Sequence, residues 1–264
     1  MPRTALITGA SSGIGAAFAE VFAAEGFDLV VTARREDRLG ALADRLARQH
    51  GRQVHVVPAD LARRDAAQVL HDAVASRGIV VDALVNNAGY GVPGAYLASP
   101  WTRHDEFLQV MVTAVAELTH RFLPGMVERG YGRIINVASL AGLTPPPAGH
   151  TLYAASKAFL IKFSEALSHE VIARGVHVTA VCPGFTLSEF HDVTGTRDKM
   201  NRLPRWIWLD APTVARQGYD AVSRGTPVYV NGGVNRAIAT LVRVMPESLV
   251  RGVGRRLGRA YRKV

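Results

Sequence analysis

The 264-residue sequence predicts an α/β fold: a single Rossmann-like, doubly wound domain with a mainly parallel sheet. Three observations support this class. Strand-like apolar segments alternate with amphipathic helical segments along most of the chain. The first strand is followed directly by a glycine-rich loop and a helix. The length suits one hydrophobic core, and the sequence holds neither an internal repeat nor a low-complexity stretch.

Seven segments are predicted to be strands because they are short, apolar and rich in β-branched residues. They cover residues 5–8, 28–33, 53–58, 83–86, 132–138, 177–182 and 227–231. Segments with helical spacing of apolar residues lie between them, at 14–25, 36–50, 65–76, 102–128, 152–173 and 213–223. This alternation favours about seven parallel strands with helices on both faces of the sheet.

The composition excludes several classes of protein. The longest apolar runs are far shorter than the ~20 residues that span a bilayer, and Met1-Pro2-Arg3 is not followed by the apolar core of a secretion signal. We therefore expect a cytoplasmic protein. The single cysteine, Cys182, excludes an internal disulfide and lies in a predicted buried strand, where an inert thiol is expected. The nine histidines show no ligand spacing, so no metal site is predicted.

The loop after the first predicted strand has the sequence Thr8-Gly-Ala-Ser-Ser-Gly-Ile-Gly15. Gly9 allows a sharp turn, Gly13 allows the backbone to approach a pyrophosphate, and Gly15 allows the helix to pack on the strand. Backbone amides at the start of the helix would bind the same anion. Three glycines alone are a weak signal, but their place between a strand and a helix predicts a dinucleotide site.

The residues after the second predicted strand bear on the choice of dinucleotide. An acidic residue here binds the ribose 2′-hydroxyl of NAD, whereas an arginine accommodates the 2′-phosphate of NADP. The sequence has Ala33 at this point, followed by Arg34 and Arg35. NADP(H) is therefore the predicted cofactor. In the alternative interpretation the arginines only begin a solvated helix, which suits Arg38 better than Arg34.

Tyr153 and Lys157 are four residues apart, so a helix places them one turn apart on the same face. A cation about 4 Å from a phenol, at an effective dielectric constant of ~20, lowers the pKa of the phenol by up to about three units. Tyr153 would then come close to the range in which general acid–base catalysis is efficient. Such pairs are also common as ordinary surface neighbours, so the surrounding motifs decide between the two interpretations.

Further motifs follow the predicted strands: Asp60-Leu61, Asn86-Asn-Ala-Gly89, Ser139 and Pro183-Gly184. Together with Tyr153-x-x-x-Lys157, these motifs resemble those of the classical short-chain dehydrogenase/reductase family, of the type that prefers NADP. They occur in the family's order and near the family's spacing. The resemblance covers residues 3–232, nearly the whole predicted domain. It implies a Rossmann-type fold and an NADP-dependent enzyme acting on CH–OH and C=O groups.

The resemblance also assigns roles to residues. Ser139 would hydrogen-bond the substrate oxygen, Tyr153 would exchange a proton with it, and Lys157 would bind the nicotinamide ribose and lower the pKa of the tyrosine. The expected cofactor-binding residues, besides Tyr153 and Lys157, are Gly9, Ser11, Ser12, Gly13, Ile14 and Gly15 at the diphosphate, Arg34 and Arg35 at the 2′-phosphate, Asp60, Leu61, Asn87, Ala88 and Gly89 around the adenosine half, and Pro183, Gly184, Thr186 and Ser188 at the carboxamide.

One position departs from the family pattern. The long helix before the Ser139 strand carries an asparagine in the family, which bends the helix and anchors a water through which protons reach the lysine. This sequence has Met111 there, and a thioether is a weak acceptor that cannot donate. The usual proton relay is therefore in question. Gln109 and Thr113 lie on other faces of the helix and are not expected to replace the asparagine.

The predicted reaction interconverts a carbonyl compound and an alcohol with NADP(H), and Tyr153 is the general acid–base. A substrate lid over residues 185–211 contains aromatic side chains, which favour a hydrophobic ketone or aldehyde, sterol-like or fatty-chain; core packing of Trp206 and Trp208 explains them equally well. One residue more than is usual between Ser139 and Tyr153 would lengthen the Pro145–His150 turn and alter the pocket wall. The alternative function, supported by the departure at position 111, is an NADP(H)-binding redox-responsive or scaffold protein with little turnover.

Basic residues are concentrated at the C-terminal end. Residues 235–264 hold eight arginines and lysines against Glu247 alone, a net charge of +7 out of +9 for the whole chain. We therefore expect a dinucleotide-binding and catalytic domain over residues 1–234 and a basic helical extension after it. The extension is predicted to dock on the domain or a neighbouring subunit, or else to lie on an anionic membrane surface; nucleic acid is not an expected partner. The family resemblance implies a homodimer or homotetramer formed through the helices at 102–128 and 152–173.

Overall fold

The computed structural model describes residues 2–146, 148–187 and 207–245. Within these ranges the core is a seven-stranded sheet in the order β3-β2-β1-β4-β5-β6-β9, and each pair of neighbouring strands is parallel. The strands are β1 (Thr4–Thr8), β2 (Asp28–Thr32), β3 (Val54–Val56), β4 (Ala83–Asn86), β5 (Gly132–Val137), β6 (Val176–Cys182) and β9 (Val228–Val230). The predicted doubly wound sheet and its seven strands are confirmed. The strand order reverses between β1 and β4, the point at which such sheets bind ligands.

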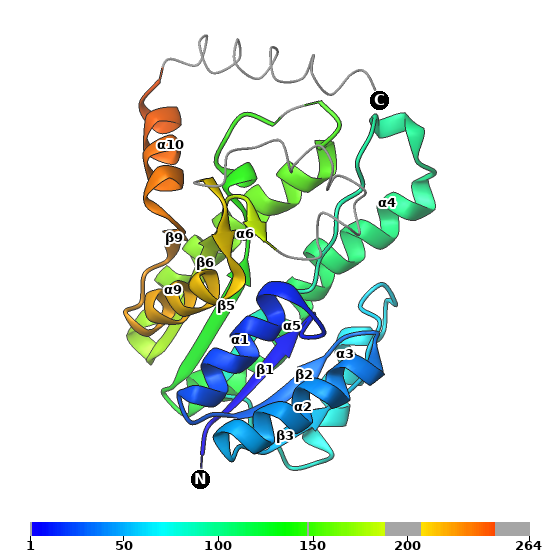
Figure 1. Cartoon of the computed structure of the whole chain (residues 1–264), viewed down its shortest axis with the longest axis vertical. Coiled ribbons are helices and arrows are strands. Elements are labelled where there is room, and N and C mark those ends of the chain that lie inside the picture. The colour runs from blue at the N-terminus through cyan, green and yellow to red at the C-terminus, as the bar shows by residue number, and fades with distance from the viewer. Residues whose placement is uncertain (1, 147, 188–206, 246–264) are drawn as a thin grey trace.

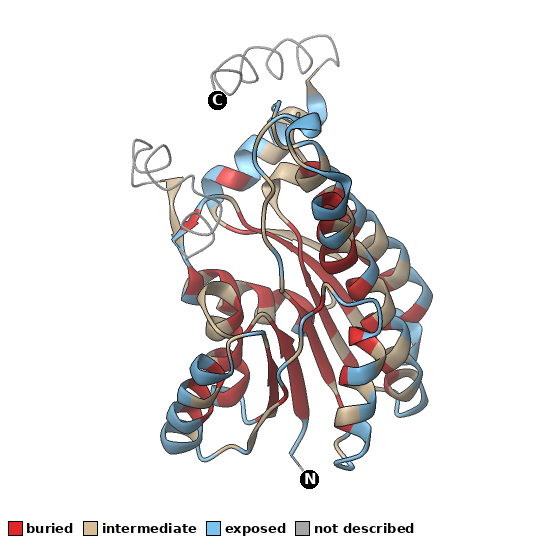
Figure 2. Cartoon of the chain, turned by 90° about the vertical axis from the view of Figure 1, so that its right-hand side faces the viewer, coloured by how far each residue is buried: buried red, intermediate tan, exposed pale blue. Residues whose placement is uncertain are grey.

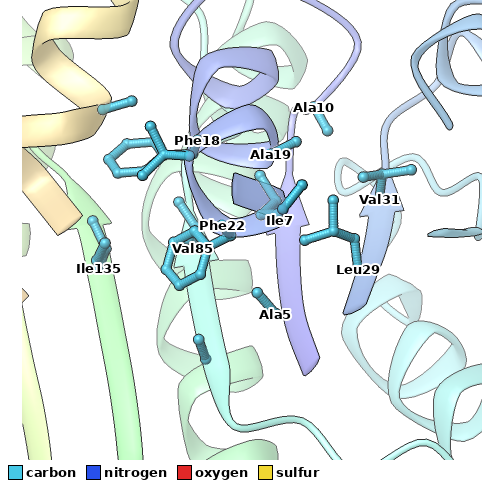
Figure 3. Packing of buried hydrophobic residues seen from close by; sticks show 14 of the residues in the cluster. Ala5, Ile7, Ala10, Phe18, Ala19, Phe22, Leu29, Val31, Val85 and Ile135 are labelled. Carbon is cyan, nitrogen blue, oxygen red and sulfur yellow. The ribbon is translucent and has the colours of Figure 1, made fainter. Parts of the chain in front are cut away.

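Helices cover both faces of this sheet (Figure 1). One layer consists of α1 (Gly13–Ala24), α2 (Glu36–His50) and α9 (Ala211–Ser223), and the other contains α3 (Ala66–Ala75), α5 (Ala114–Glu128) and α6 (Thr151–Val171). Successive residues of β1 point to opposite layers, because Ala5 and Ile7 join the core under α1 whereas Leu6 joins the core under α3. Figure 3 shows Phe18 and Phe22 of α1 in the first core, and Figure 2 shows how the buried residues concentrate in the sheet.

The segment predicted as one helix over 102–128 is interrupted. It begins as α4 (Trp101–Leu108), widens into the π-helical turn η2 (Gln109–Thr113) and continues as α5. A π-turn adds a residue to the helical turn and bends the helix axis, and such turns are frequent at functional sites. The other helices agree with the predicted ranges to within two residues.

Several elements were not predicted. Short 3-10 turns occur at η1 (Tyr96–Ala98), η3 (Leu140–Gly142) and η4 (Ile172–Arg174), and two short parallel strands, β7 (Thr186–Leu187) and β8 (Leu209–Asp210), pair with each other. The last described helix is α10 (Gly233–Val244), so the predicted boundary at residue 234 falls inside a helix. The rest of the predicted extension, 246–264, lies outside the described residues. Within the described ranges, no helix is both long enough and apolar enough to cross a membrane.

Candidate active site

The glycine-rich loop lies at the carboxyl end of β1, at the switch point of the sheet. Gly9 and Gly13 have φ angles of 66° and 56°, in the left-handed region that favours glycine. A Cβ on Gly15 would lie 2.3 Å from the carbonyl oxygen of Gly9 and 2.5 Å from Nδ2 of Asn87. The loop therefore turns back onto the first turn of α1 as closely as the sequence predicts. Ser11, Ser12 and Ile14 lie in the same loop and first turn and are half-buried.

A hydrogen-bond network joins this loop to the segment after β4. Asn87 Nδ2 donates to the carbonyl oxygens of Thr8 (3.0 Å) and Gly9 (3.3 Å). Thr8 Oγ1 accepts from the backbone amides of Asn87 (2.9 Å) and Ala88 (3.0 Å). Thr8 was not predicted as a functional residue, although a hydroxyl at the last position of a strand before a glycine loop was a usable signal. The network aligns the two loops that border the predicted adenosine site.

Of the two predicted arginines, the structure brings Arg35 to the glycine-rich loop. Its Nη2 donates to Ser11 Oγ (3.0 Å) and Ser12 Oγ (2.9 Å), and its Nε donates to Ser11 Oγ (3.2 Å). Arg34 is exposed next to it. A guanidinium at this place lies between the end of β2 and the loop, where the sequence predicts the 2′-phosphate. Neither position carries a carboxylate.

The other predicted adenosine residues lie at neighbouring strand ends. Asp60 and Leu61 follow β3, with the Asp60 side chain exposed and accepting from the backbone amide of Ala62 at 3.1 Å, whereas Leu61 is buried. Gly89 lies against Met111, because a Cβ on this glycine would be 2.8 Å from the methionine Sδ. The glycine at this position therefore leaves room for the methionine.

Ser139, Tyr153 and Lys157 come together at the carboxyl ends of β5 and β6. Ser139 Oγ accepts from the backbone amide of Ala141 (3.1 Å) and is hydrogen-bonded to the Tyr153 side chain. The turn that carries Ser139 lies directly on α6, since a Cβ on Gly142 would be 2.7 Å from the carbonyl carbon of Lys157. This close approach places the serine hydroxyl beside the phenol despite the additional residue between them.

Burial shifts the pKa values of the tyrosine and the lysine in opposite directions. It raises the pKa of Tyr153, which the hydrogen bond with Ser139 opposes, and it lowers the pKa of Lys157 from 10.5 to about 8. The lysine Nζ donates to the carbonyl oxygen of Val137 at 2.7 Å and lies 5.7 Å from the centre of the tyrosine ring. The net shift of the Tyr153 pKa is therefore upward in this arrangement, because desolvation outweighs the hydrogen bond with Ser139, and the ammonium group of Lys157 is held by a strand carbonyl.

Met111 lies in the π-turn and is buried, with 1% of its surface exposed. The bend that the asparagine is expected to cause is present here with a methionine, so the bend does not depend on that asparagine. What this chain lacks at position 111 is a side chain that can hold a water, since a thioether does not donate a hydrogen bond.

The predicted carboxamide residues follow β6. Gly184 lies against Asn235 of α10, because a Cβ on the glycine would be 2.5 Å from the asparagine Oδ1. Asn235 is buried and its Nδ2 donates to the carbonyl oxygen of Asn231 at 2.8 Å. Thr186 Oγ1 donates to the carbonyl oxygen of Gly184 at 3.2 Å, and Pro183 is buried beside them. Asn235 was not predicted, since its helix carries no recognised motif.

The predicted lid is described only at its two ends. β7 and β8 pair in parallel and hold these ends together, and the rings of Phe185 and Trp208 lie 5.6 Å apart. Ser188 and Trp206 lie outside the described residues, as does most of the lid. In the ranges that are described, no cluster of three or more histidine, cysteine, aspartate or glutamate side chains is placed to hold a metal ion. Cys182 is fully buried, and burial raises the pKa of its thiol to about 12.

A glycine-rich loop at the switch point of a parallel sheet, with a serine, a tyrosine and a lysine at the adjoining strand ends, defines a Rossmann-type dinucleotide-binding domain with a candidate proton-transfer site. The family model described as short chain dehydrogenase matches residues 3–199. The chain belongs to this family and is an oxidoreductase.

Relatives and solved structures agree with this assignment. Nodulation protein G of Rhizobium sp. (strain N33) is 36% identical over 241 residues, which cover 88% of this chain and 96% of the relative. A short-chain dehydrogenase from Sphingobium yanoikuyae in complex with NADPH has a TM-score of 0.80 at 31% identity, covering 93% of this chain and 96% of the other. The bulky-bulky ketone specific alcohol dehydrogenase from Comamonas testosteroni has a TM-score of 0.75 at 29% identity, covering 93% and 95%.

Proposed function

We propose that this protein is an NADP(H)-dependent oxidoreductase that interconverts a ketone or aldehyde with the corresponding alcohol. The observation that carries the proposal is the hydrogen-bonded pair of Ser139 and Tyr153, with Lys157 one helical turn away, at the same edge of the sheet as the glycine-rich loop. The NADPH in the Sphingobium yanoikuyae structure supports the choice of cofactor.

The residues of this chain divide the chemistry with the cofactor. Bound NADP(H) supplies or accepts the hydride. Ser139 would hydrogen-bond the carbonyl oxygen, and Tyr153, whose raised pKa keeps the phenol protonated at neutral pH, would donate the proton during reduction. Lys157 would bind the nicotinamide ribose. In the opposite direction the same phenol oxygen would accept the proton of the alcohol.

NADP(H) is proposed over NAD(H) because of the residues that follow β2. Arg35 donates to both serines of the loop, and Ala33 leaves no carboxylate to repel a 2′-phosphate. A guanidinium is suited to bind phosphate through paired hydrogen bonds. Arg34 is exposed at the same corner and would add positive charge.

A hydrophobic substrate is proposed from the described ends of the lid. Phe185 and Trp208 lie against each other, and the phenylalanine is 38% exposed. Aromatic surface at a ligand site favours apolar ligands. The preference of the Comamonas testosteroni enzyme for bulky-bulky ketones supports the same class.

Steady-state oxidation of NADPH tests this proposal directly. The full-length protein is mixed with a panel of aldehydes and ketones of increasing size, and absorbance at the nicotinamide band is followed with and without each compound. We expect turnover that is faster with hydrophobic ketones than with small polar ones. Binding of NADPH without turnover on any member of the panel contradicts the proposal.

That outcome would favour the second candidate, an NADP(H)-binding protein with little turnover. Two observations favour this candidate: Met111 at the position of the expected asparagine, and the hydrogen bond from Lys157 to the carbonyl oxygen of Val137. Met111 removes the side chain that would hold the water of the usual proton relay, and Lys157 contacts a strand carbonyl oxygen. The panel therefore separates the two functions.

We also propose that two copies associate through α5 and α6. On α6 the rings of Phe159 and Phe163 stack 5.7 Å apart, and Phe159 is 39% exposed. Exposed aromatic side chains on long helices are typical of subunit interfaces. Phe159→Asp should lower the mass measured by sedimentation, whereas Leu97→Asp, at an exposed site outside both helices, should leave it unchanged. Equal masses for both variants would contradict association through α6.

A further inference from the structure

A small, partly open pocket is lined by Tyr153. The segment before α4, α4 itself and the first residues of α6 form it, and its lining includes His104, Phe107, Thr151 and Tyr153. The space in it that the centre of a water-sized sphere can occupy is about 10 Å³, roughly enough for one water molecule. The pocket is therefore too small for a substrate and large enough for a single water.

His104 lines this pocket, and one nitrogen of its imidazole has no hydrogen-bond partner among the described residues. Its Nε2 lies 2.8 Å from the backbone carbonyl oxygen of Tyr96. A carbonyl only accepts, so Nε2 carries the proton and, in the neutral ring, Nδ1 is an acceptor. Nδ1 is fully buried and has no hydrogen-bond partner among the described residues.

Packing holds the ring of His104 in place. His104 is 6% exposed and stacks on the ring of Tyr96 at 4.7 Å with an interplanar angle of 11°. A buried acceptor without a partner is strongly unfavourable, and native proteins satisfy most such groups with side chains or ordered water. One water in the pocket satisfies Nδ1. The histidine thus has the character of a water anchor.

The pocket is lined by residues on both the site side and the solvent side. Thr151 lines it and is itself exposed to solvent, and Tyr153 lines it from α6. On the long helix, the position of the expected asparagine is taken by the buried thioether of Met111, which lies against Gly89. A proton that reaches Tyr153 from solvent through the pocket would not depend on the side chain at position 111.

We propose that His104 anchors a buried water that returns protons from solvent to Tyr153, in place of the relay that Met111 interrupts. The proposal rests on the oxidoreductase function. After Tyr153 has given its proton to the substrate oxygen, the water gives a proton to the phenolate and forms the new O–H bond. It takes a replacement proton from bulk water through the Thr151 hydroxyl, so no charge stays in the pocket. His104 acts through Tyr153 and is a positioning residue.

Two substitutions test the functions of the two ring nitrogens separately. In His104→Gln the longer side chain places an amide N–H near the position of Nε2 and preserves a donor to Tyr96, but it removes the acceptor at Nδ1. In His104→Asn the shorter side chain places an amide oxygen near Nδ1 and preserves the acceptor, but it removes the donor. A merely structural histidine that holds Tyr96 would be replaced better by glutamine.

For a water anchor we expect the opposite order, in which asparagine replaces the histidine better than glutamine does. His104→Gln should lower kcat by about tenfold, less than the roughly 10²–10⁴-fold lost with the general acid itself, and increase the solvent deuterium isotope effect on kcat. His104→Asn should stay within about twofold of the wild-type kcat. Adding Met111→Asn to His104→Gln should restore the rate, because it supplies a water-holding amide on the other route. Equal losses in both variants, or an unchanged isotope effect in His104→Gln, would overturn the proposal.

A measurement without turnover tests the water itself. In ¹⁵N-labelled protein without substrate, Nδ1 of His104 should be unprotonated and hydrogen-bonded, with a magnetisation-transfer peak to a slowly exchanging water. A protonated Nδ1, or the absence of that peak, rejects the water site whatever the activity. If the wild type fails on every carbonyl compound while the peak is present, the proposed function fails and the water site stands.

The exposed face of α10 carries a second and independent inference. Val234, Ile238 and Leu241 are 40%, 40% and 57% exposed, and their spacing places them on one stripe of the helix. Asn235 is buried on a different face, where α10 contacts Gly184. The stripe therefore points away from the domain.

Charge distinguishes between two candidate partners for this stripe, a second copy of the chain and a lipid surface. Arg236 and Arg243 are exposed on the polar side of the helix, and the chain from residue 235 onward carries a net charge of +7. A second copy in a two-fold symmetric contact would bring two such charges together. An anionic lipid surface complements the charge and takes up the apolar stripe.

We infer that α10 lies on an anionic lipid surface with this stripe inserted. In flotation with vesicles of phosphatidylserine and phosphatidylcholine, the full chain should float, and it should stay at the bottom with phosphatidylcholine alone or at high salt. Ile238→Asp with Leu241→Asp should reduce flotation at least about fivefold, whereas Leu97→Asp, a matched change at an exposed leucine elsewhere, should not. Equal flotation of both variants, or a loss of oligomer mass in the α10 variant alone, would contradict the inference.

Discussion

At the scale of single residues, burial shifts the pKa values of Tyr153 and Lys157 in the direction that favours their neutral forms. It raises the pKa of the phenol and lowers the pKa of the amine to about 8. A protonated phenol that is hydrogen-bonded to Ser139 is ready to donate, which suits carbonyl reduction. A buried lysine that contacts the carbonyl oxygen of Val137 is held in place at a free-energy cost to the fold.

Tyr153→Phe tests the proton donor. The variant keeps the ring and loses the hydroxyl, so we expect kcat to fall by about 10²–10⁴-fold while the Kd for NADPH changes little. Stopped-flow turnover and titration of NADPH fluorescence give the two quantities. A variant that keeps more than half of the wild-type kcat would exclude Tyr153 as the general acid.

Lys157→Met tests the cost of the buried cation. Below pH 8 the lysine is protonated in both states, and the folded state carries the full penalty. Between pH 8 and 10.5 the unfolded chain holds a proton that the folded chain has lost, so wild-type stability rises with pH in this window. A shift from 10.5 to about 8 corresponds to roughly 3 kcal/mol, and loss of the hydrogen bond to Val137 offsets about 1–2 of it.

The variant should therefore be inactive and more stable than the wild type by about 1–2 kcal/mol at pH 7. This advantage should be lost by pH 10 in urea unfolding followed by circular dichroism. An advantage that is the same at both pH values, or a large loss of stability at pH 7, would contradict a depressed lysine pKa.

Arg35→Ala tests the choice of cofactor. Loss of a charged hydrogen bond to phosphate is worth roughly 1.5–3 kcal/mol, so the ratio of kcat/KM for NADPH to that for NADH should fall at least about tenfold. Arg34→Ala is the matched control at the neighbouring exposed position and should lower the ratio less. A larger effect from Arg34 would assign the 2′-phosphate to that residue.

At the scale of elements, what is predictable follows from local patterns. Buried parallel strands and amphipathic helices were located to within about two residues because apolar periodicity alone specifies them. The π-turn at Gln109–Thr113 was not predicted, since a helix with one additional residue in a turn keeps nearly the same pattern. The pair β7 and β8 is two residues long in each strand and depends on a long-range contact, which periodicity does not report.

Gly15→Ala tests the packing of the glycine-rich loop on α1. The new Cβ would lie 2.3 Å from the carbonyl oxygen of Gly9, so the loop must shift, and we expect lower stability together with weaker NADPH binding. Gly40→Ala on α2 is the control, because no heavy atom lies within 4 Å of its Cβ position. It should raise the free energy of unfolding by about 0.5–1 kcal/mol and leave binding unchanged. Thermal unfolding should therefore show stability changes of opposite sign for the two variants. A stabilising Gly15→Ala would contradict the packing.

At the scale of the whole molecule, the parallel sheet gathers its candidate site from segments that are far apart in sequence. The carboxyl ends of β1, β4, β5 and β6 lie along one edge, so Gly9, Asn87, Ser139 and Pro183 meet there. Their placement was predictable from motif order. The direction of the shift in the Tyr153 pKa was not predictable, because it depends on desolvation by the assembled core.

Two further contributions to the site come only from the assembled fold. Asn235 on α10 supports Gly184, and His104 on α4 borders Tyr153 through a shared pocket. Neither residue belongs to a sequence motif, and each reaches the site because helices from different parts of the chain pack around the same strand ends.

The central claim is that hydride passes from NADPH to a carbonyl carbon at the Ser139–Tyr153 site. The most direct measurement uses NADPH deuterated at C4 of the nicotinamide, a hydrophobic ketone and mass spectrometry of the alcohol. The account predicts one deuterium on the carbinol carbon with the wild type and at least about 100-fold less product with Tyr153→Phe. Bound NADPH with no deuterium in any alcohol, or equal transfer by the two proteins, would contradict it.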